Sequence, residues 1–267
     1  MKRSPAVAGQ FYQGNAARLT EQVEQYMVRG TPTEEVIGML SPHAGLIYSG
    51  HVAGAVFSAI RIPKTFILLG PNHTGLGPHI SLMDSGEWEI PTGLLQIDKK
   101  LASKIALANP AVTRDSQAHL FEHSLEVQLP FISYCSPDAK IVPIALLAAT
   151  YDDCVGLADS ISKAVKSVDY PVVILASSDM SHYQPDTVAR QKDKKAIDRI
   201  LDLDPLGLYE TVLKERISMC GYLPATVMLA AAKMLGAGSA RLVKYATSGE
   251  VSGDYDSVVG YAGIIVK

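Results

Sequence analysis

Three of the seven histidines stand in turns that directly follow short apolar runs. They are His43, His73 and His182, and they follow residues 36–40, 65–69 and 171–175. In open α/β sheets ligands bind outside the carboxyl ends of the strands, so we expect these imidazoles to converge at one sheet edge. Two imidazoles and one anionic side chain can hold iron, copper or zinc with open positions. A single histidine is more often only a polar turn residue, but three at equivalent strand ends predict a mononuclear metal site.

Cys220 is the cysteine best placed for chemistry. It lies in the turn of residues 219–224, just before an expected helix. A helix N-terminus lowers the pKa of a thiol in principle, which favours the thiolate as a metal ligand or a nucleophile. Cys135 and Cys154 fall inside helical patterns and are interpreted as packing residues.

Two polar segments have alternative interpretations. In residues 122–131, His123 and Glu126 are three apart and would share a helix face, either as a capped helix start or as a wall that faces a substrate. The long polar stretch 248–257 is either a mobile connection or a rim that brings Asp254 to a site. The sequence leaves both choices open.

The elements that must position these residues alternate along the chain. Apolar runs predict central strands at 36–40, 65–69, 141–144 and 171–175, and later strands at 241–245 and 258–266. Helical patterns cover residues 15–29, 49–60, 99–107, 157–168, 186–203 and 224–235. No linker divides the chain, so we expect residues 1–267 to form one three-layer α/β domain with a mixed or parallel central sheet flanked by helices.

Composition narrows the class of protein. The 267 residues are 48% hydrophobic and 19% charged, which is typical of a globular chain. The net charge of −3, without a basic stripe, argues against a nucleic-acid binder. Three irregularly spaced cysteines favour a reducing compartment, and no apolar run predicts a signal peptide or membrane span. The sequence therefore predicts a cytoplasmic protein that does not bind membranes.

Six segments, in this order and with these separations, resemble the Memo family, whose prokaryotic members are called AmmeMemoRadiSam system protein B. They read PHAGLIYSG, GPNH, EHSLEVQLPF, SSDMSHY, CGYLP and SGDYDSVVGYA, and they span residues 42–262. The resemblance implies a fold similar to the class III extradiol (LigB-like) dioxygenases. In those enzymes a helix-flanked sheet carries Fe(II) held by two histidines and one glutamate.

The resemblance also implies roles for individual residues. His43 and His73 match the metal histidines, and Cys220 stands at the third ligand position, where the dioxygenases have a carboxylate. His182 matches an acid/base histidine, and His123 is similar to a substrate-facing one. Since thiolate is softer than carboxylate, copper or zinc would be favoured as well as iron. Asp179, three residues before His182, would orient it or join the metal shell.

These observations leave three hypotheses for function. The first is iron- or copper-dependent redox chemistry on an unknown small substrate, with His182 and Asp179 catalytic. The second is hydrolysis by zinc-activated water or by Cys220. The third is a module that binds a peptide or phosphorylated ligand. Substrate-binding candidates are His123, Glu126, Tyr48 and Asp254. The resemblance further implies a link to a radical-SAM enzyme and its small companion protein in prokaryotes, and to phosphotyrosine-receptor signalling in animals.

Overall fold

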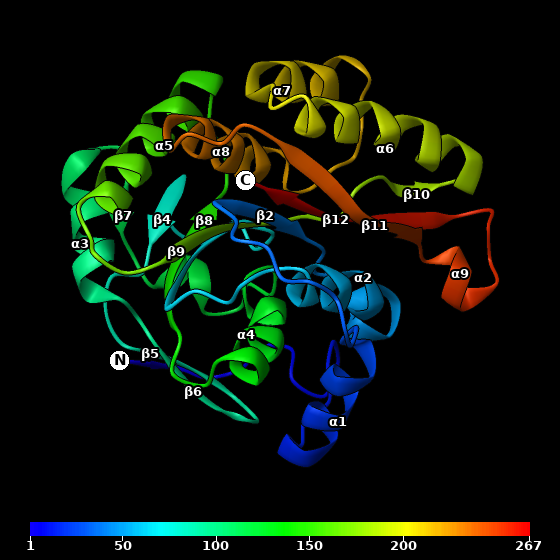
Figure 1. The fold of residues 1–267 in the computed structure, drawn as a ribbon, viewed down its shortest axis with the longest axis horizontal. Coiled ribbons are helices and arrows are strands. Elements are labelled where there is room, and N and C mark those ends of the chain that lie inside the picture. Colours follow the sequence, from blue (N-terminus) through cyan, green and yellow to red (C-terminus); the bar gives the residue numbers. More distant parts are fainter.

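A nine-stranded mixed sheet organises the fold in the computed structural model, which describes residues 1–267 (Figure 1). Eight strands follow the order β10-β12-β2-β9-β3-β8-β4-β7, and β11 pairs with β12. Their bounds are β2 Gly38–Ser41, β3 Thr65–Pro71, β4 Ile80–Leu82, β7 Thr113–Arg114, β8 Lys140–Leu146, β9 Val172–Ser177, β10 His182–Gln184, β11 Ala240–Thr247 and β12 Val258–Val266.

The centre of the sheet is parallel. Strands β2, β9, β3 and β8 are neighbours in that order, and each pair of neighbours is parallel. They are almost entirely buried, as expected for apolar strands covered on both faces. These are the four strands that the sequence placed at the centre. Antiparallel pairing of β12 with β2 and of β4 with β8 makes the sheet mixed.

Helices cover both faces of the sheet and complete three layers (Figure 1). Helices α3, α5, α6, α7 and α8 lie over one face, and α1, α2 and α4 lie over the other. Their bounds are α1 Ala16–Tyr26, α2 Leu46–Ser58, α3 Lys99–Ala108, α4 Leu129–Cys135, α5 Tyr151–Lys166, α6 Asp186–Leu201, α7 Pro205–Lys214, α8 Tyr222–Met234 and α9 Gly249–Ser252. One core of 64 buried hydrophobic residues joins the layers, which confirms the α/β class.

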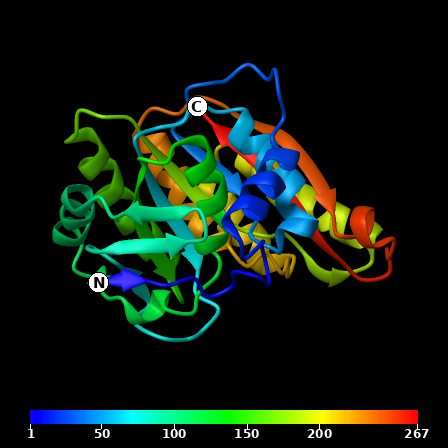
Figure 2. The ribbon, with the colours of Figure 1, turned by 90° about the horizontal axis from the view of Figure 1, so that it is seen from below.

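A small second sheet holds the start of the chain. It has the order β1-β5-β6, with bounds β1 Lys2–Arg3, β5 Glu87–Ile90 and β6 Gly93–Gln96. Strand β1 runs parallel to β5 and lies at the edge of this sheet (Figure 2). The apolar pattern did not reveal these short strands, and it also missed α7.

Residues 122–131 differ from the expected helix. His123 lies in a loop, followed by the 3-10 helix η2 (Glu126–Gln128) and then by α4. His123 and Glu126 therefore do not share the face of one α-helix. In the stretch 248–257 only α9 is helical, and Gly253 ends it with a φ of 75°. None of the helices is both long enough and apolar enough to cross a membrane.

Candidate metal centre

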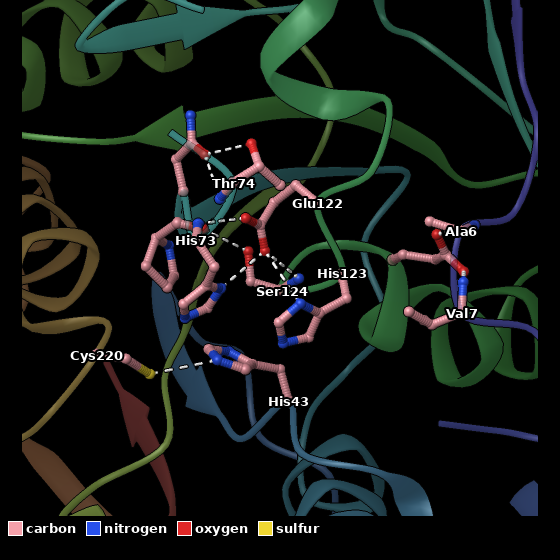
Figure 3. A network of polar contacts seen from close by, with 12 residues as sticks. Ala6, Val7, His43, His73, Thr74, Glu122, His123, Ser124 and Cys220 are labelled. Atoms are coloured by element: carbon pink, nitrogen blue, oxygen red, sulfur yellow. Dashed lines mark hydrogen bonds and ion pairs between the residues drawn. The ribbon is translucent and has the colours of Figure 1, made fainter. Parts of the chain in front are cut away.

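Three histidines from three separate loops converge beyond the ends of the parallel strands (Figure 3). His43 follows β2, His73 follows β3, and His123 lies between the 3-10 helix η1 (Gln117–His119) and η2. One ring nitrogen of each lies within 4.8 Å of the others, so the three can hold a metal ion. We call these residues the three-histidine cluster. His43 is only 2% exposed, whereas the side chains of His73 and His123 are 36% and 23% exposed.

Two histidines of the cluster, His43 and His123, favour their neutral forms. Burial lowers the pKa of His43 well below its usual value, and the neighbouring His123 and His73 act in the same direction. Burial also lowers the pKa of His123, although the charge of Glu122 opposes this shift. The rings of His73 and His123 are stacked, with centroids 4.7 Å apart. Neutral imidazole is the form that binds metals, so His43 and His123 are in the form that can bind a cation.

Ser177, at the end of β9, fixes the ring of His43. The Ser177 hydroxyl donates to the backbone oxygen of Ser124 at 2.6 Å and accepts from Gln128 Nε2 at 2.9 Å. Its single hydrogen is therefore used, and the contact of 2.9 Å with His43 Nδ1 requires that nitrogen to donate. His43 Nε2 is therefore unprotonated, and its lone pair can accept a hydrogen bond or bind a metal ion.

Glu122 fixes His73 in the same way. Its Oε1 lies 2.9 Å from His73 Nδ1 and accepts from the backbone N–H of Ser124 at 2.8 Å. Burial opposes ionisation of Glu122, but hydrogen bonds from His73 and Ser124 lower its pKa to about 2. An ionised carboxylate only accepts, so His73 Nδ1 carries the proton and Nε2 is free. Neither Glu122 nor Ser177 was predicted as a site residue from the sequence; the one available signal was the carboxylate next to His123.

Cys220 lies beside the cluster, as the resemblance led us to expect. Its Sγ is 3.3 Å from His43 Nε2 and 3.6 Å from the backbone oxygen of Asp179 (Figure 3). The expectation of a lowered thiol pKa is wrong for the protein alone. Burial, followed by the Asp179 carboxylate, raises the pKa of Cys220. The cost of desolvating the buried thiolate therefore outweighs the stabilisation that the N-terminus of α8 could give it.

Asp179 is close to the cluster but does not orient His182. Its Oδ1 accepts from the backbone N–H groups of His43 and Ala44, at 2.8 and 3.2 Å, so it holds the loop after β2. His182 is oriented by Ser218, whose backbone oxygen lies 2.8 Å from His182 Nδ1. Since a carbonyl only accepts, Nδ1 carries the proton and Nε2 of His182 is free.

Three predicted substrate-binding residues are not part of the cluster. Glu126 is fully buried, and its carboxylate binds Arg3, Tyr12 and two backbone N–H groups, so the expectation that it faces a substrate is corrected. Tyr48 is 39% exposed in the first turn of α2. Asp254 is exposed in the loop after α9, where its Oδ1 accepts from Asp256 N at 2.9 Å.

The fold and the cluster define an α/β protein with a histidine-rich candidate metal centre at the carboxyl ends of parallel strands. A family model described as Memo-like protein matches residues 3–265. The MEMO1 family proteins of Methanosarcina barkeri and Saccharolobus solfataricus are each 41% identical to this chain. The alignments cover 99% of this chain and 100% of the first relative, and 98% of each chain for the second. The chain therefore belongs to the Memo family.

One solved structure supports the fold assignment. The crystal structure of an uncharacterized protein from Escherichia coli K12 matches with a TM-score of 0.55 and 14% sequence identity. The match covers 86% of this chain and 100% of that one. This likeness concerns the fold alone, and it is consistent with the LigB-like architecture expected from the sequence.

Proposed function

We propose that this Memo-family protein binds one iron or copper ion and uses it for redox chemistry on a small substrate. The ligands would be His43, His73 and His123 of the cluster, with the thiolate of Cys220 beside them. The observation that carries the proposal is the convergence of three ring nitrogens, within 4.8 Å of one another, from three loops. Zinc is the alternative ion, since imidazole and thiolate also suit it.

The donor set fits such an ion. Ser177 and Glu122 occupy the Nδ1 atoms of His43 and His73, so each presents an unprotonated Nε2. This is the arrangement in which partners of the second ring nitrogen orient metal-binding histidines. A bound iron or copper ion would supply Lewis-acid polarisation and electron transfer. A bound cation would also offset the cost of ionising the Cys220 thiol.

The chain supplies a group that can move a proton. His182 donates its Nδ1 proton to the backbone oxygen of Ser218, which leaves Nε2 free to accept a proton and return it. Asp179 acts differently: it holds the backbone of His43 and Ala44, which keeps His43 in place. In this proposal His182 is the acid/base residue and Asp179 supports the metal-binding loop.

Elemental analysis of anaerobically purified protein tests the proposal. We expect about one equivalent of iron or copper in the wild type, consistent with one imidazole cluster, and loss of the metal in His43→Ala and His73→Ala. His79→Ala, an exposed histidine outside the cluster, is the matched control and should keep the metal. Oxygen consumption with candidate substrates should disappear in the same two variants. Equal and negligible metal in all four proteins would overturn the proposal.

A second candidate is hydrolysis with Cys220 as the nucleophile, because Sγ lies 3.3 Å from His43 Nε2. The raised pKa of Cys220 disfavours it, since a resting nucleophile needs the thiolate. Alkylation of Cys220 distinguishes a nucleophile from a metal ligand. A nucleophile reacts readily at neutral pH with or without metal, whereas a metal ligand is protected only when metal is bound.

The radical-SAM partner is a proposal that rests on the family resemblance, whereas the peptide ligand rests on the histidine-rich loops and on the exposed Tyr48, Tyr183 and Tyr255. A peptide or phosphorylated ligand would be captured equally well by wild type and by metal-free His43→Ala. A complex with the radical-SAM enzyme and its companion protein would be detected by co-purification of all three. Failure to recover the companion proteins at any salt concentration would remove that link.

A further inference from the structure

We propose that residues 3–12, which we call the N-terminal strap, position the loop that carries Glu122 and His123, so that Arg3, Glu126 and Phe11 are positioning residues of the candidate metal centre. The strap begins at β1 and ends before α1 (Figure 2). The inference deepens the proposed function, and its metal-binding test rests on that function. Its hydrogen-exchange test does not depend on the proposed function.

The first step is a buried ion pair between the two segments. Arg3 and Glu126 are 1% and 0% exposed, are separated by 123 residues in the chain, and bind through Nη1 and Oε2. Arg3 also stacks on Trp88, with its guanidinium carbon 4.2 Å from the ring centroid. Burying two charges is costly unless their remaining hydrogen-bonding groups are satisfied.

Those remaining groups bind the backbone just before His123. Arg3 Nε donates to the backbone oxygen of His119 at 2.7 Å, and Nη2 donates to the backbone oxygen of Glu122 at 2.7 Å. One planar guanidinium therefore connects residues 119, 122 and 126 of a segment with little regular structure. Because Glu122 orients His73, the arginine contacts the backbone of a residue that fixes one cluster member and directly precedes another, His123.

The carboxylate of Glu126 completes the connection from the other side. It accepts from the backbone N–H of Ala6 at 2.8 Å, from that of Val7 at 3.0 Å, and from Tyr12 Oη at 2.6 Å. All of these donors belong to the strap. A substitution of Glu126 would therefore release the strap at several points. Because both carboxylate oxygens are already used by the strap, this buried acid is not available to a substrate.

Phe11 carries the effect into the cluster. Its ring centroid lies 4.8 Å from that of His123, and the His123 ring in turn stacks on that of His73. The backbone oxygen of Phe11 accepts from the N–H of Leu46, the first residue of α2, at 2.7 Å. Leu46 follows His43 by three residues. The strap thus contacts the loops of two cluster histidines directly.

Hydrogen exchange of the metal-free protein gives the first test. Arg3→Met removes every donor and keeps an apolar side chain, and Glu126→Gln keeps the shape of the acid. We expect exchange in residues 119–125 to rise about tenfold or more in both variants. The control is Leu157→Ala in α5, which lowers stability from the opposite face and should leave this segment unchanged relative to the rest of the protein. Exchange within about twofold of wild type in either variant, measured against the same protein's core amides, would overturn the proposal.

Cobalt binding gives the second test. We expect Arg3→Met and Glu126→Gln to weaken Co²⁺ affinity by about tenfold or more and to change its absorption spectrum, as for other supports of metal ligands. Leu157→Ala should bind as the wild type does. If either charge variant fails to fold, Phe11→Ala, which leaves the ion pair intact, must show the same loss. Normal Co²⁺ affinity in folded variants would overturn the inference. A wild type that binds no Co²⁺ would overturn the proposed function, whereas the exchange result would still decide the role of the strap.

Discussion

The side chain of Ser177 determines which nitrogen of His43 faces the cluster. Its register partner on β2 is Ser41, which is equally buried but has no hydrogen-bond partner for its hydroxyl. Two serines of the same burial, on neighbouring strands, therefore differ in their hydrogen bonding, and only Ser177 contacts a cluster histidine. The difference arises because only Ser177 is reached by the side chains of His43 and Gln128.

Ser177→Ala should weaken metal binding by about 10- to 100-fold, because His43 Nδ1 loses its acceptor and both ring tautomers become accessible. Ser41→Ala is the matched control and should bind metal as the wild type does. Titration with Co²⁺ measures the affinity, and ¹⁵N shifts of the His43 ring report the tautomer without metal. Equal losses in the two variants would contradict this role of Ser177.

Glu122→Gln should lower the pKa of His123 further. The negative charge of Glu122 raises the pKa of His123 against the effect of burial, so removing that charge leaves desolvation less opposed. NMR titration of the metal-free protein measures the shift. Glu89→Gln, which removes a half-buried acid in β5, is the control. A His123 pKa that rises in Glu122→Gln would contradict this electrostatic assignment.

Strand ends were enough to predict His43 and His73 as neighbours, and the family resemblance placed Cys220 beside them, but neither revealed their chemical states. The pKa of Cys220 depends on burial and on Asp179, which lies 41 residues earlier in the chain. Ser177 forms hydrogen bonds with residues that are separated from it by 49, 53 and 134 positions in the sequence. Such distant contacts leave no local pattern in the sequence.

At the scale of elements, apolar runs predicted the four central strands because burial on both faces demands them. Residues 122–131 were wrongly expected to form one helix, because buried polar side chains, rather than apolar ones, determine their conformation. Glu122, Ser124, Glu126 and Gln128 are all fully buried, and each makes a polar contact with a residue distant in the sequence. Tertiary hydrogen bonds overrode the helical spacing of the apolar residues between them.

Gly54→Ala should destabilise the protein by about 1–3 kcal/mol, because overpacking is costly where the backbone cannot move. Helix α2 crosses the end of α1 at this residue, and an added Cβ would lie 2.2 Å from the backbone oxygen of Tyr26. Gly156, in α5, is the matched control, since a Cβ there meets only Asn109 Nδ2 at 3.6 Å. Gly156→Ala should stabilise by up to about 1 kcal/mol. Urea unfolding measures both, and a neutral Gly54→Ala would contradict the close helix contact.

At the scale of the whole molecule, acid should destabilise the fold through His119. Burial, and then the charge of Arg3, lowers the pKa of this fully buried residue from 6.5 to about 4. Between these values the unfolded chain binds the proton and the folded protein does not, so stability falls as pH falls from about 6.5 to about 4.

His119→Gln removes this dependence. The variant should be less stable than wild type at neutral pH, and the difference should narrow by about 2 kcal/mol between about pH 6.5 and about pH 4.5. Urea unfolding at several pH values measures the change, with exposed His79→Gln as the control. A constant difference between wild type and His119→Gln would contradict the assignment.

The pairing of β2 with two late strands has a consequence for the order of folding. This early strand lies between β9 and β12, so its backbone hydrogen bonds can form only after residues much later in the chain have been synthesised. His43 and Cys220, whose side chains meet, are separated by 177 residues. Closing such long loops slows folding, because entropy is lost before contacts repay it. A nascent chain on the ribosome therefore has no complete metal-binding site until most of the protein has emerged, and any metal must be acquired late in biosynthesis or after release.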